Sequence, residues 1–242
     1  ADVSGKGIPA AMFMMTAKTI IKDLAERGMA VNEIFTKANE KLCENNESGM
    51  FVTAWMGILD VTTGKMQFAN AGHNPPLLKH INGTFEYLKT RPGFVLAGME
   101  GICYKTGELT LQPGDRLFLY TDGVTEATNI NNMLYGEERL QSFMNNNFDK
   151  EPKELLQSLK NDIDEFVGEA PQFDDITMLI FDYKQQYGGD DMVSKIFPAK
   201  IETLSQVISF VEETLENYEC SIKAQTAICV AVEEIFVNVA NY

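Results

Sequence analysis

The spacing of hydrophobic residues changes along the chain, and this change limits the folds that it can adopt. At residues 9–28 and 34–42, apolar residues recur every three to four positions, which predicts two helices. At residues 51–121 they alternate or form short blocks between turn residues, which predicts strands. Helical spacing returns at residues 137–144 and 152–167. This order favours an α+β fold in which helices pack on antiparallel sheets.

The strand pattern is divided by turn residues into separate segments. Thr-Gly and Asn-Gly pairs separate the first four, which we expect to form one antiparallel meander. A last strand is predicted after the later helices. The predicted strands are residues 51–59, 65–71, 77–81, 84–88, 108–111, 116–121 and 176–181.

Residues 184–195 are polar, contain a Gly-Gly pair and lack periodicity, as expected of a linker. Residues 1–183 would then form one domain, and residues 196–242 part of a second. The second part has only two helical patterns, too few to enclose a core, so we expect an incomplete domain. The chain begins with Ala and ends inside an apolar helical pattern, which is expected of a fragment or a trimmed form of a longer protein.

The charge balance argues against polyanionic partners. The 20 Lys and Arg residues are outnumbered by 35 Asp and Glu residues, giving a formal net charge of −15. Such a chain repels nucleic acid and anionic membrane surfaces. The four cysteines form no CxxC pair and there are only two histidines, so neither a zinc site nor a disulfide framework is expected. No apolar run approaches the roughly 20 residues of a membrane span. We expect a cytoplasmic protein with reduced cysteines.

Three aspartates stand beside predicted strands: Asp2, Asp122 and Asp174. Carboxylates gathered at the end of a β core are suitable ligands for Mg²⁺ or Mn²⁺. Taken alone, each signal is weak, because Asp122-Gly123 is more often a turn and Asp174-Asp175 a solvated loop. The motifs around them change this balance.

Four motifs occur in order along the chain. They are Ala-Asp-Val-Ser-Gly-Lys-Gly at 1–7, Ala-Gly-His-Asn-Pro-Pro at 71–76, Tyr-Thr-Asp-Gly-Val-Thr-Glu-Ala at 120–127 and Phe-Asp-Asp-Ile-Thr at 173–177. In this order they resemble the SpoIIE/RsbU-like branch of the PPM (PP2C-type) serine/threonine phosphatases. The resemblance covers residues 1–183. It implies a β-sandwich of two antiparallel sheets flanked by helices, with two Mn²⁺ or Mg²⁺ ions at one edge.

The resemblance also implies roles for individual residues. Asp2 would be a bridging metal ligand and the Val3 carbonyl its neighbour, while Asp122 and Asp174 would hold the metals from the other side. The same three aspartates are the expected catalytic residues. Two metals can activate water and clamp the phosphoryl oxygens, so no protein nucleophile is required.

Other features of these motifs allow two interpretations. His73 could be a general acid, but we favour a histidine that fixes its turn. Residues 4–7 lack the spacing of a P-loop and are assigned to the metal-site turn. Met12, Met14 and Met15 could form a partner surface, but we favour a core helix.

The chain departs from the family pattern in two places. The upstream Gly-Gly-Asp-x-Tyr-Asp segment, which supplies another ligand, is absent from this sequence, so we expect impaired metal binding and activity. The phosphate-binding Arg of eukaryotic PP2C enzymes has no counterpart that we can identify.

The end of the chain, residues 233–242, resembles the N-box helix of the GHKL ATPases related to RsbW. Taken alone, this motif is better explained by an ordinary amphipathic helix with acidic residues. Its position after phosphatase motifs favours instead the start of an α/β ATPase domain. Glu234 and Asn238 are four residues apart and share a helical face. In the full-length protein they would polarise a hydroxyl and ligate the Mg²⁺ of ATP-Mg, but this chain alone should not be a working kinase.

Together, these features lead us to expect a bacterial phosphoprotein phosphatase. Its implied substrate is a phosphorylated STAS-type anti-sigma-factor antagonist, with a sigma factor as a further partner of the C-terminal domain. A pseudo-phosphatase, which binds a partner without hydrolysis, is the alternative. A third possibility is a parent protein that acts mainly as a kinase.

Overall fold

The computed structural model describes residues 1–44, 46–171, 174–184, 195–198, 200–217 and 221–240, with only the backbone described at 234 and 238–240. The chain divides into two compact units, Ala1–Gln186 and Tyr187–Tyr242, which are considered separately. Most of the predicted linker, residues 184–195, lies outside the described residues.

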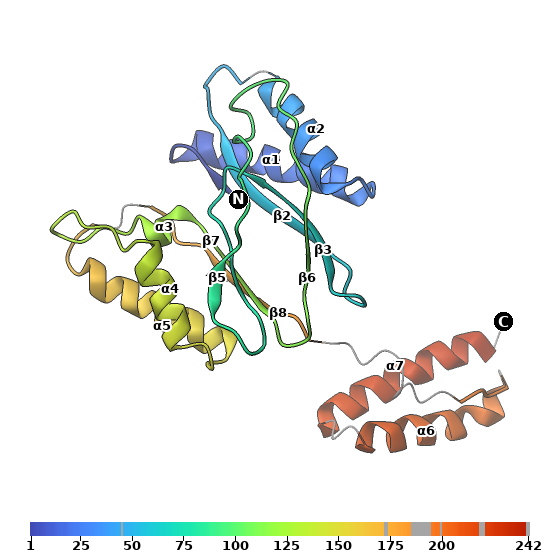
Figure 1. Ribbon diagram of the computed structural model, residues 1–242. Helices are drawn as coiled ribbons and strands as arrows, with labels where there is room; N and C mark the ends of the chain where they lie inside the picture. The colour runs from blue at the N-terminus through green and yellow to red at the C-terminus, as the bar shows by residue number, and fades with distance from the viewer. Residues whose placement is uncertain (45, 172–173, 185–194, 199, 218–220, 241–242) are drawn as a thin grey trace. The chain divides into compact units, whose positions relative to one another are not determined.

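Two four-stranded antiparallel sheets lie at the centre of the larger unit (Figure 1). They confirm the predicted α+β sandwich of two antiparallel sheets. The first sheet has the order β1 (Asp2–Val3), β2 (Val52–Leu59), β3 (Lys65–Ala71) and β6 (Gly107–Thr110). The second has the order β5 (Phe85–Tyr87), β4 (Leu77–Lys79), β7 (Arg116–Tyr120) and β8 (Met178–Asp182).

Helices cover the outer face of each sheet. The first sheet packs against α1 (Ile8–Glu26) and α2 (Val31–Cys43), and the second against α4 (Glu137–Asn146) and α5 (Pro152–Val167). Proline stands in the first turn of α1 and of α5, where its missing N–H costs nothing. A third cluster fills the space between the sheets; its buried members are Met66, Leu111, Leu117 and Tyr183.

The predicted single meander is wrong, because β3 pairs with β6 and not with β4. The chain leaves β3 through Gly72, whose φ is +70°, and then passes Pro75 and Pro76. Proline has no N–H to donate to a neighbouring strand, so pairing stops here. The chain crosses to the second sheet, where β4 pairs with β5 and β7.

Strand register brings particular residues to one end of the sandwich. In the first sheet, Asp2 pairs with Thr53. In the second, Tyr120 at the end of β7 pairs with Met178 at the start of β8. At the opposite end of this pair, the Arg116 guanidinium donates to both carboxylate oxygens of Asp182 at 2.6 and 2.9 Å. This bidentate pair fixes which residues emerge from β7 and β8 at the other end.

The methionines of α1 are divided between two environments. Met14 packs against the core cluster under the first sheet. Met12 and Met15 are 64% and 69% exposed, so the predicted core location is wrong for these two. The helix is less amphipathic than its sequence spacing indicated.

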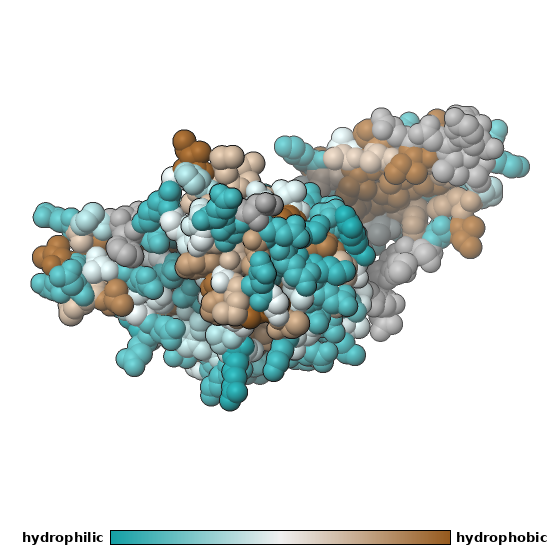
Figure 2. All heavy atoms as spheres, turned by 90° about the horizontal axis from the view of Figure 1, so that it is seen from above, coloured by the Kyte–Doolittle hydropathy of each residue, from teal (hydrophilic) through white to brown (hydrophobic). Residues whose placement is uncertain are grey.

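The described part of the smaller unit consists of a short 3-10 helix, Ile201–Thr203, and two helices, α6 (Leu204–Asn217) and α7 (Ile222–Ala240). Hydrophobic side chains gather along these helices (Figure 2), and Ile222 is 83% exposed. Two helices leave apolar surface that they cannot cover alone. Among the described residues of both units, no helix is long and apolar enough to cross a membrane.

Candidate functional site

The first of the three aspartates, Asp2, is held by the edge of the first sheet. It lies in β1, and Val3 beside it pairs with Val52 of β2. The next residue, Ser4, exchanges two hydrogen bonds with Phe51: its N–H donates to the Phe51 carbonyl at 2.9 Å, and its Oγ accepts from the Phe51 N–H at 2.8 Å. These bonds fix the backbone on the C-terminal side of Asp2.

The other two aspartates emerge from the second sheet. Asp122 follows β7 and begins the short helix α3 (Asp122–Thr125), while Asp174 precedes β8. Buried Thr121 joins the two segments. Its hydroxyl donates to the Asp175 carbonyl at 3.1 Å and accepts from the Thr177 N–H at 3.0 Å, and its own N–H donates to the Thr177 carbonyl at 3.1 Å. Thr121 therefore sets the separation of Asp122 and Asp174.

Gly123 allows these segments to approach closely. A Cβ atom at this position would lie 2.3 Å from the Asp175 carbonyl oxygen, so no larger residue fits without a backbone shift. Asp122-Gly123 is thus more than a turn signal. Sequence reasoning missed the positioning roles of Thr121 and Gly123, although both lie inside the motif at 120–127.

The three predicted aspartates meet at this end of the sandwich. One carboxylate oxygen from each of Asp2, Asp122 and Asp174 lies within 4.8 Å of the other two. The Asp122 Oδ1 atom is buried and has no hydrogen-bond partner. Burial, and then the charges of Asp122 and Asp174, raise the pKa of the Asp2 carboxyl above its ordinary value. A buried acceptor without a donor, among like charges, is costly unless a cation is present.

The donor set fits a hard divalent cation. Mg²⁺ and Mn²⁺ prefer carboxylate and carbonyl oxygens, which Asp2, Asp122, Asp174 and the backbone at Val3 can provide. Partial burial, and then the charges of Asp122 and Asp174, also raise the pKa of Glu126. Glu126 adds to the negative charge around the cluster, and sequence reasoning missed it.

Two further residues border the cluster. The exposed Asp175 turns its N–H toward Asp174 and donates to Oδ1 at 2.9 Å. From the other side, the Lys6 ammonium lies 3.4 Å from the same Asp174 oxygen. Asp175 thus contributes its backbone, and its side chain is not part of the three-aspartate cluster.

His73 lies near the site and is 6% exposed. Asn70 brackets it, accepting from the His73 N–H at 2.7 Å and donating to the His73 carbonyl at 2.9 Å. The ring Nδ1 atom is 2.9 Å from Thr53 Oγ1. Burial lowers the pKa of His73 to about 4, so the ring is neutral at pH 7. These contacts are those of a residue that fixes its turn.

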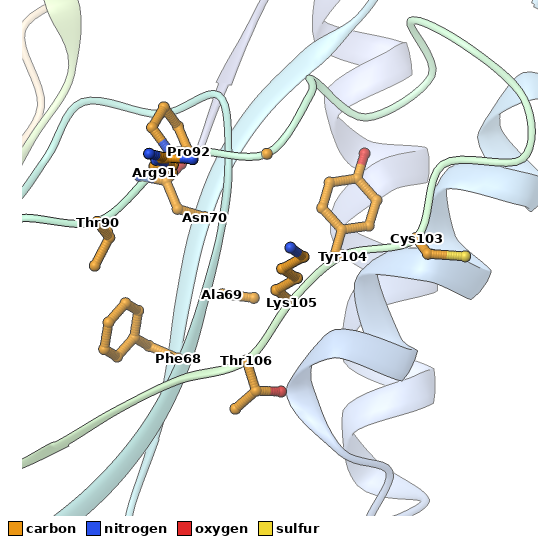
Figure 3. A pocket seen from close by; sticks show the side chains of 12 residues that line it. Phe68, Ala69, Asn70, Thr90, Arg91, Pro92, Cys103, Tyr104, Lys105 and Thr106 are labelled. Atoms are coloured by element: carbon orange, nitrogen blue, oxygen red, sulfur yellow. The ribbon is translucent and has the colours of Figure 1, made fainter.

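The same asparagine lines a separate pocket of about 420 Å³ (Figure 3). Loops on either side supply Arg91 and Lys105, and the exposed Cys103 lies at its border. None of the three aspartates lines this pocket. The candidate chemistry is therefore at the carboxylate cluster.

The last two predicted residues, Glu234 and Asn238, lie in α7. Their side chains are outside the described residues, so their shared helical face stays a prediction.

The model of the family described as Stage II sporulation protein E (SpoIIE) matches residues 1–184. The chain belongs to the SpoIIE family. Protein IcfG of Synechocystis sp. is 27% identical to this SpoIIE chain over 205 residues, covering 74% of the chain and 32% of IcfG. Phosphoserine phosphatase RsbU of Bacillus subtilis is 28% identical over 181 residues, covering 74% of the chain and 53% of RsbU. The chain thus spans between about a third and about half of the length of these relatives.

Solved structures share the fold. The RsbU and RsbW domains of Rv1364c from Mycobacterium tuberculosis match with a TM-score of 0.69 at 22% identity, over 98% of this chain and 64% of that one. The SiaA-PP2C domain of Pseudomonas aeruginosa matches with a TM-score of 0.65 at 22% identity, over 75% of this chain and 73% of that domain. The catalytic domain of the serine threonine protein phosphatase PstP, in complex with two manganese ions, matches with a TM-score of 0.54 at 13% identity. The match covers 74% of this chain and 83% of that one. The larger unit has the PP2C-type fold.

Proposed function

We propose that the SpoIIE domain of this chain is a metal-dependent protein serine/threonine phosphatase. The observation that carries the proposal is the convergence of Asp2, Asp122 and Asp174 from three separate segments to within 4.8 Å, with a buried Asp122 oxygen that has no donor. Family membership and the two manganese ions of PstP support a metal role for this cluster.

In the proposed site, Asp2 and the Val3 carbonyl would hold the metals from the first sheet, and Asp122 and Asp174 would hold them from the second. Two Mn²⁺ or Mg²⁺ ions held there would supply an activated water and charge compensation for the phosphoryl oxygens. The chain's own task is positioning. Thr121 and Gly123 hold the segments that carry Asp122 and Asp174 close together. This positioning matters because a shift of about 1 Å in a catalytic group can lower the rate about 100-fold.

The proposed substrate is a phosphoserine or phosphothreonine of a STAS-type anti-sigma-factor antagonist. Similarity to the phosphoserine phosphatase RsbU supports this substrate class. The proposed location is the cytoplasm. A protein substrate agrees with the open position of the cluster, where the Asp174 side chain is 30% exposed.

We propose residues 1–183 as the phosphatase domain, 184–195 as a linker and 196–242 as the start of an RsbW-like ATPase domain. The match to the RsbU and RsbW domains of Rv1364c, which covers 98% of this chain, supports the arrangement. In that domain of the longer protein, Glu234 and Asn238 would act on ATP-Mg. A sigma factor would be its partner.

Metal titration combined with phosphate release tests the proposal. Wild-type protein, Asp174→Asn and the neighbouring control Asp175→Asn are titrated with Mn²⁺ by calorimetry and incubated with a phosphoserine STAS protein. We expect Asp174→Asn to lose both metal binding and phosphate release, and Asp175→Asn to keep both. Metal-independent release, or equal loss in both variants, would contradict the ligand set.

The same experiment separates the alternative function. A pseudo-phosphatase would bind the phosphorylated STAS protein and release no phosphate at any Mn²⁺ concentration. Binding is measured in parallel by calorimetry with the phosphorylated and unphosphorylated STAS protein.

A further inference from the structure

Lys6 occupies a fixed turn at the border of the carboxylate cluster. It stands between Gly5 and Gly7, and both glycines have φ of +83°. This conformation is strained for other residues, so the turn depends on glycine on both sides of the lysine. The turn is anchored before Lys6 by the Ser4 hydrogen bonds with Phe51, the residue that precedes β2. After Lys6 it is anchored by the Gly7 carbonyl, which accepts from the Ala11 N–H in the first turn of α1.

The fixed turn places a cation beside a proposed metal ligand. The Lys6 Nζ atom lies 3.4 Å from Asp174 Oδ1, and the two side chains are 66% and 30% exposed. An ion pair this exposed contributes little to folding stability. Folding stability therefore does not account for the lysine at this position, and we consider what it could bind at the cluster.

A phosphomonoester bound at this cluster would bring further negative charge to an acidic region. Asp2, Asp122 and Asp174 carry the proposed metals, and Glu126 adds another carboxylate. Phosphoryl oxygens that face away from the metals need donors from the chain. The Lys6 ammonium has three N–H donors on a flexible side chain. It already lies beside Asp174, one of the proposed metal ligands.

We propose that Lys6 binds a non-bridging oxygen of the substrate phosphate, exchanging Asp174 for the phosphoryl group once metals neutralise that carboxylate. The inference rests on the proposed phosphatase function and adds a substrate-binding residue to it. Lys6 recognises the phosphate dianion by its charge. Other surfaces of the protein bind the rest of the substrate. Its loss weakens phosphate binding and leaves the metal ligands in place.

The test measures phosphate and metal binding separately. Inorganic phosphate is titrated by calorimetry into the Mn²⁺-loaded protein, and Mn²⁺ into the metal-free protein, for wild type, Lys6→Met and Lys6→Arg. Lys18→Met, at an exposed lysine of α1, is the control. We expect Lys6→Met to weaken phosphate binding about 10-fold or more, because a charge-assisted hydrogen bond is lost. Lys6→Arg should recover part of the loss, and Lys18→Met should match wild type.

Other outcomes are decisive as well. Unchanged phosphate affinity in Lys6→Met, with tighter Mn²⁺ binding, would overturn the proposal and make Lys6 a simple counter-ion of Asp174. Phosphate binding that depends on Lys6 in a protein without turnover would support Lys6 and contradict the phosphatase function. Wild-type protein that binds Mn²⁺ but no phosphate would overturn the Lys6 proposal alone.

Discussion

Replacing Asp122 by Asn removes one charge from the cluster and keeps the shape of the side chain. In the metal-free protein that charge is repelled by Asp2 and Asp174, with donor oxygens within 4.8 Å. At this distance Coulomb's law gives about 1 kcal/mol per pair in water and about 3.5 kcal/mol at an effective dielectric constant of about 20. The raised pKa of Asp2 and the partial exposure of the Asp174 side chain favour the lower end of this range of repulsion energies. We therefore expect Asp122→Asn to raise the free energy of unfolding in EDTA by about 1–2 kcal/mol.

In Mn²⁺ the order of stability should reverse. A ligand that binds only the folded state adds about 2.7 kcal/mol at 100 times its dissociation constant. Wild type would gain this stability, whereas Asp122→Asn would gain little because it has lost a charged ligand. Urea denaturation of both proteins, in EDTA and in Mn²⁺, measures the four free energies.

The control for this experiment is Asp175→Asn, which makes the same chemical change outside the cluster. It should follow wild type in both buffers. Lower stability of Asp122→Asn in EDTA would refute the repulsion argument. An equal gain from Mn²⁺ in Asp122→Asn and wild type would refute its role as a ligand.

Three further changes test how the site is held. Gly123→Ala should weaken Mn²⁺ binding at least about 10-fold by calorimetry, because the new Cβ would lie 2.3 Å from the Asp175 carbonyl oxygen; Gly83→Ala, whose nearest neighbouring atom is at 3.6 Å, is its control. Thr121→Val loses both hydrogen bonds of a buried hydroxyl and should lower the free energy of unfolding in urea by about 1–3 kcal/mol. Burial lowers the pKa of His73 from 6.5 to about 4, so the unfolded chain takes up a proton first on acidification. The contribution of neutral His73 to the free energy of unfolding should be fully present above pH 6.5 and be lost as the pH falls toward 4. His73→Gln should therefore flatten the pH dependence of the free energy of unfolding, measured by urea titrations.

The local patterns of the sequence predicted most elements of the larger unit. The period-two segments became strands because one face of each packs on a core, and the predicted helix at 152–167 has the bounds of α5. The crossing between sheets was not predicted, since Asn-Gly and Thr-Gly pairs specify turns and not the sheet to which the next strand belongs. The effect of Pro75 and Pro76 on strand pairing was not predicted either.

The candidate site was predicted in part, for a similar physical reason. Asp2, Asp122 and Asp174 stand in separate motifs, and the resemblance to a family brought them together. The contacts that set their separation could not be predicted, because Thr121 bonds across 54 and 56 residues to Asp175 and Thr177. Gly123 likewise owes its role to a carbonyl far along the chain.

The cluster brings together carboxylates from both sheets. Asp2 belongs to the first sheet, and Asp122 and Asp174 emerge from the second. Among the described residues, the cluster between the sheets has four buried side chains, and none of the three aspartates is among them. Repulsion among these aspartates therefore acts against this packing at the end of the sandwich where they meet. A divalent cation would replace that repulsion with bonds to both sheets. Metal binding and closure of this end of the sandwich are therefore thermodynamically linked, and the cost of gathering like charges becomes part of the affinity for the cation.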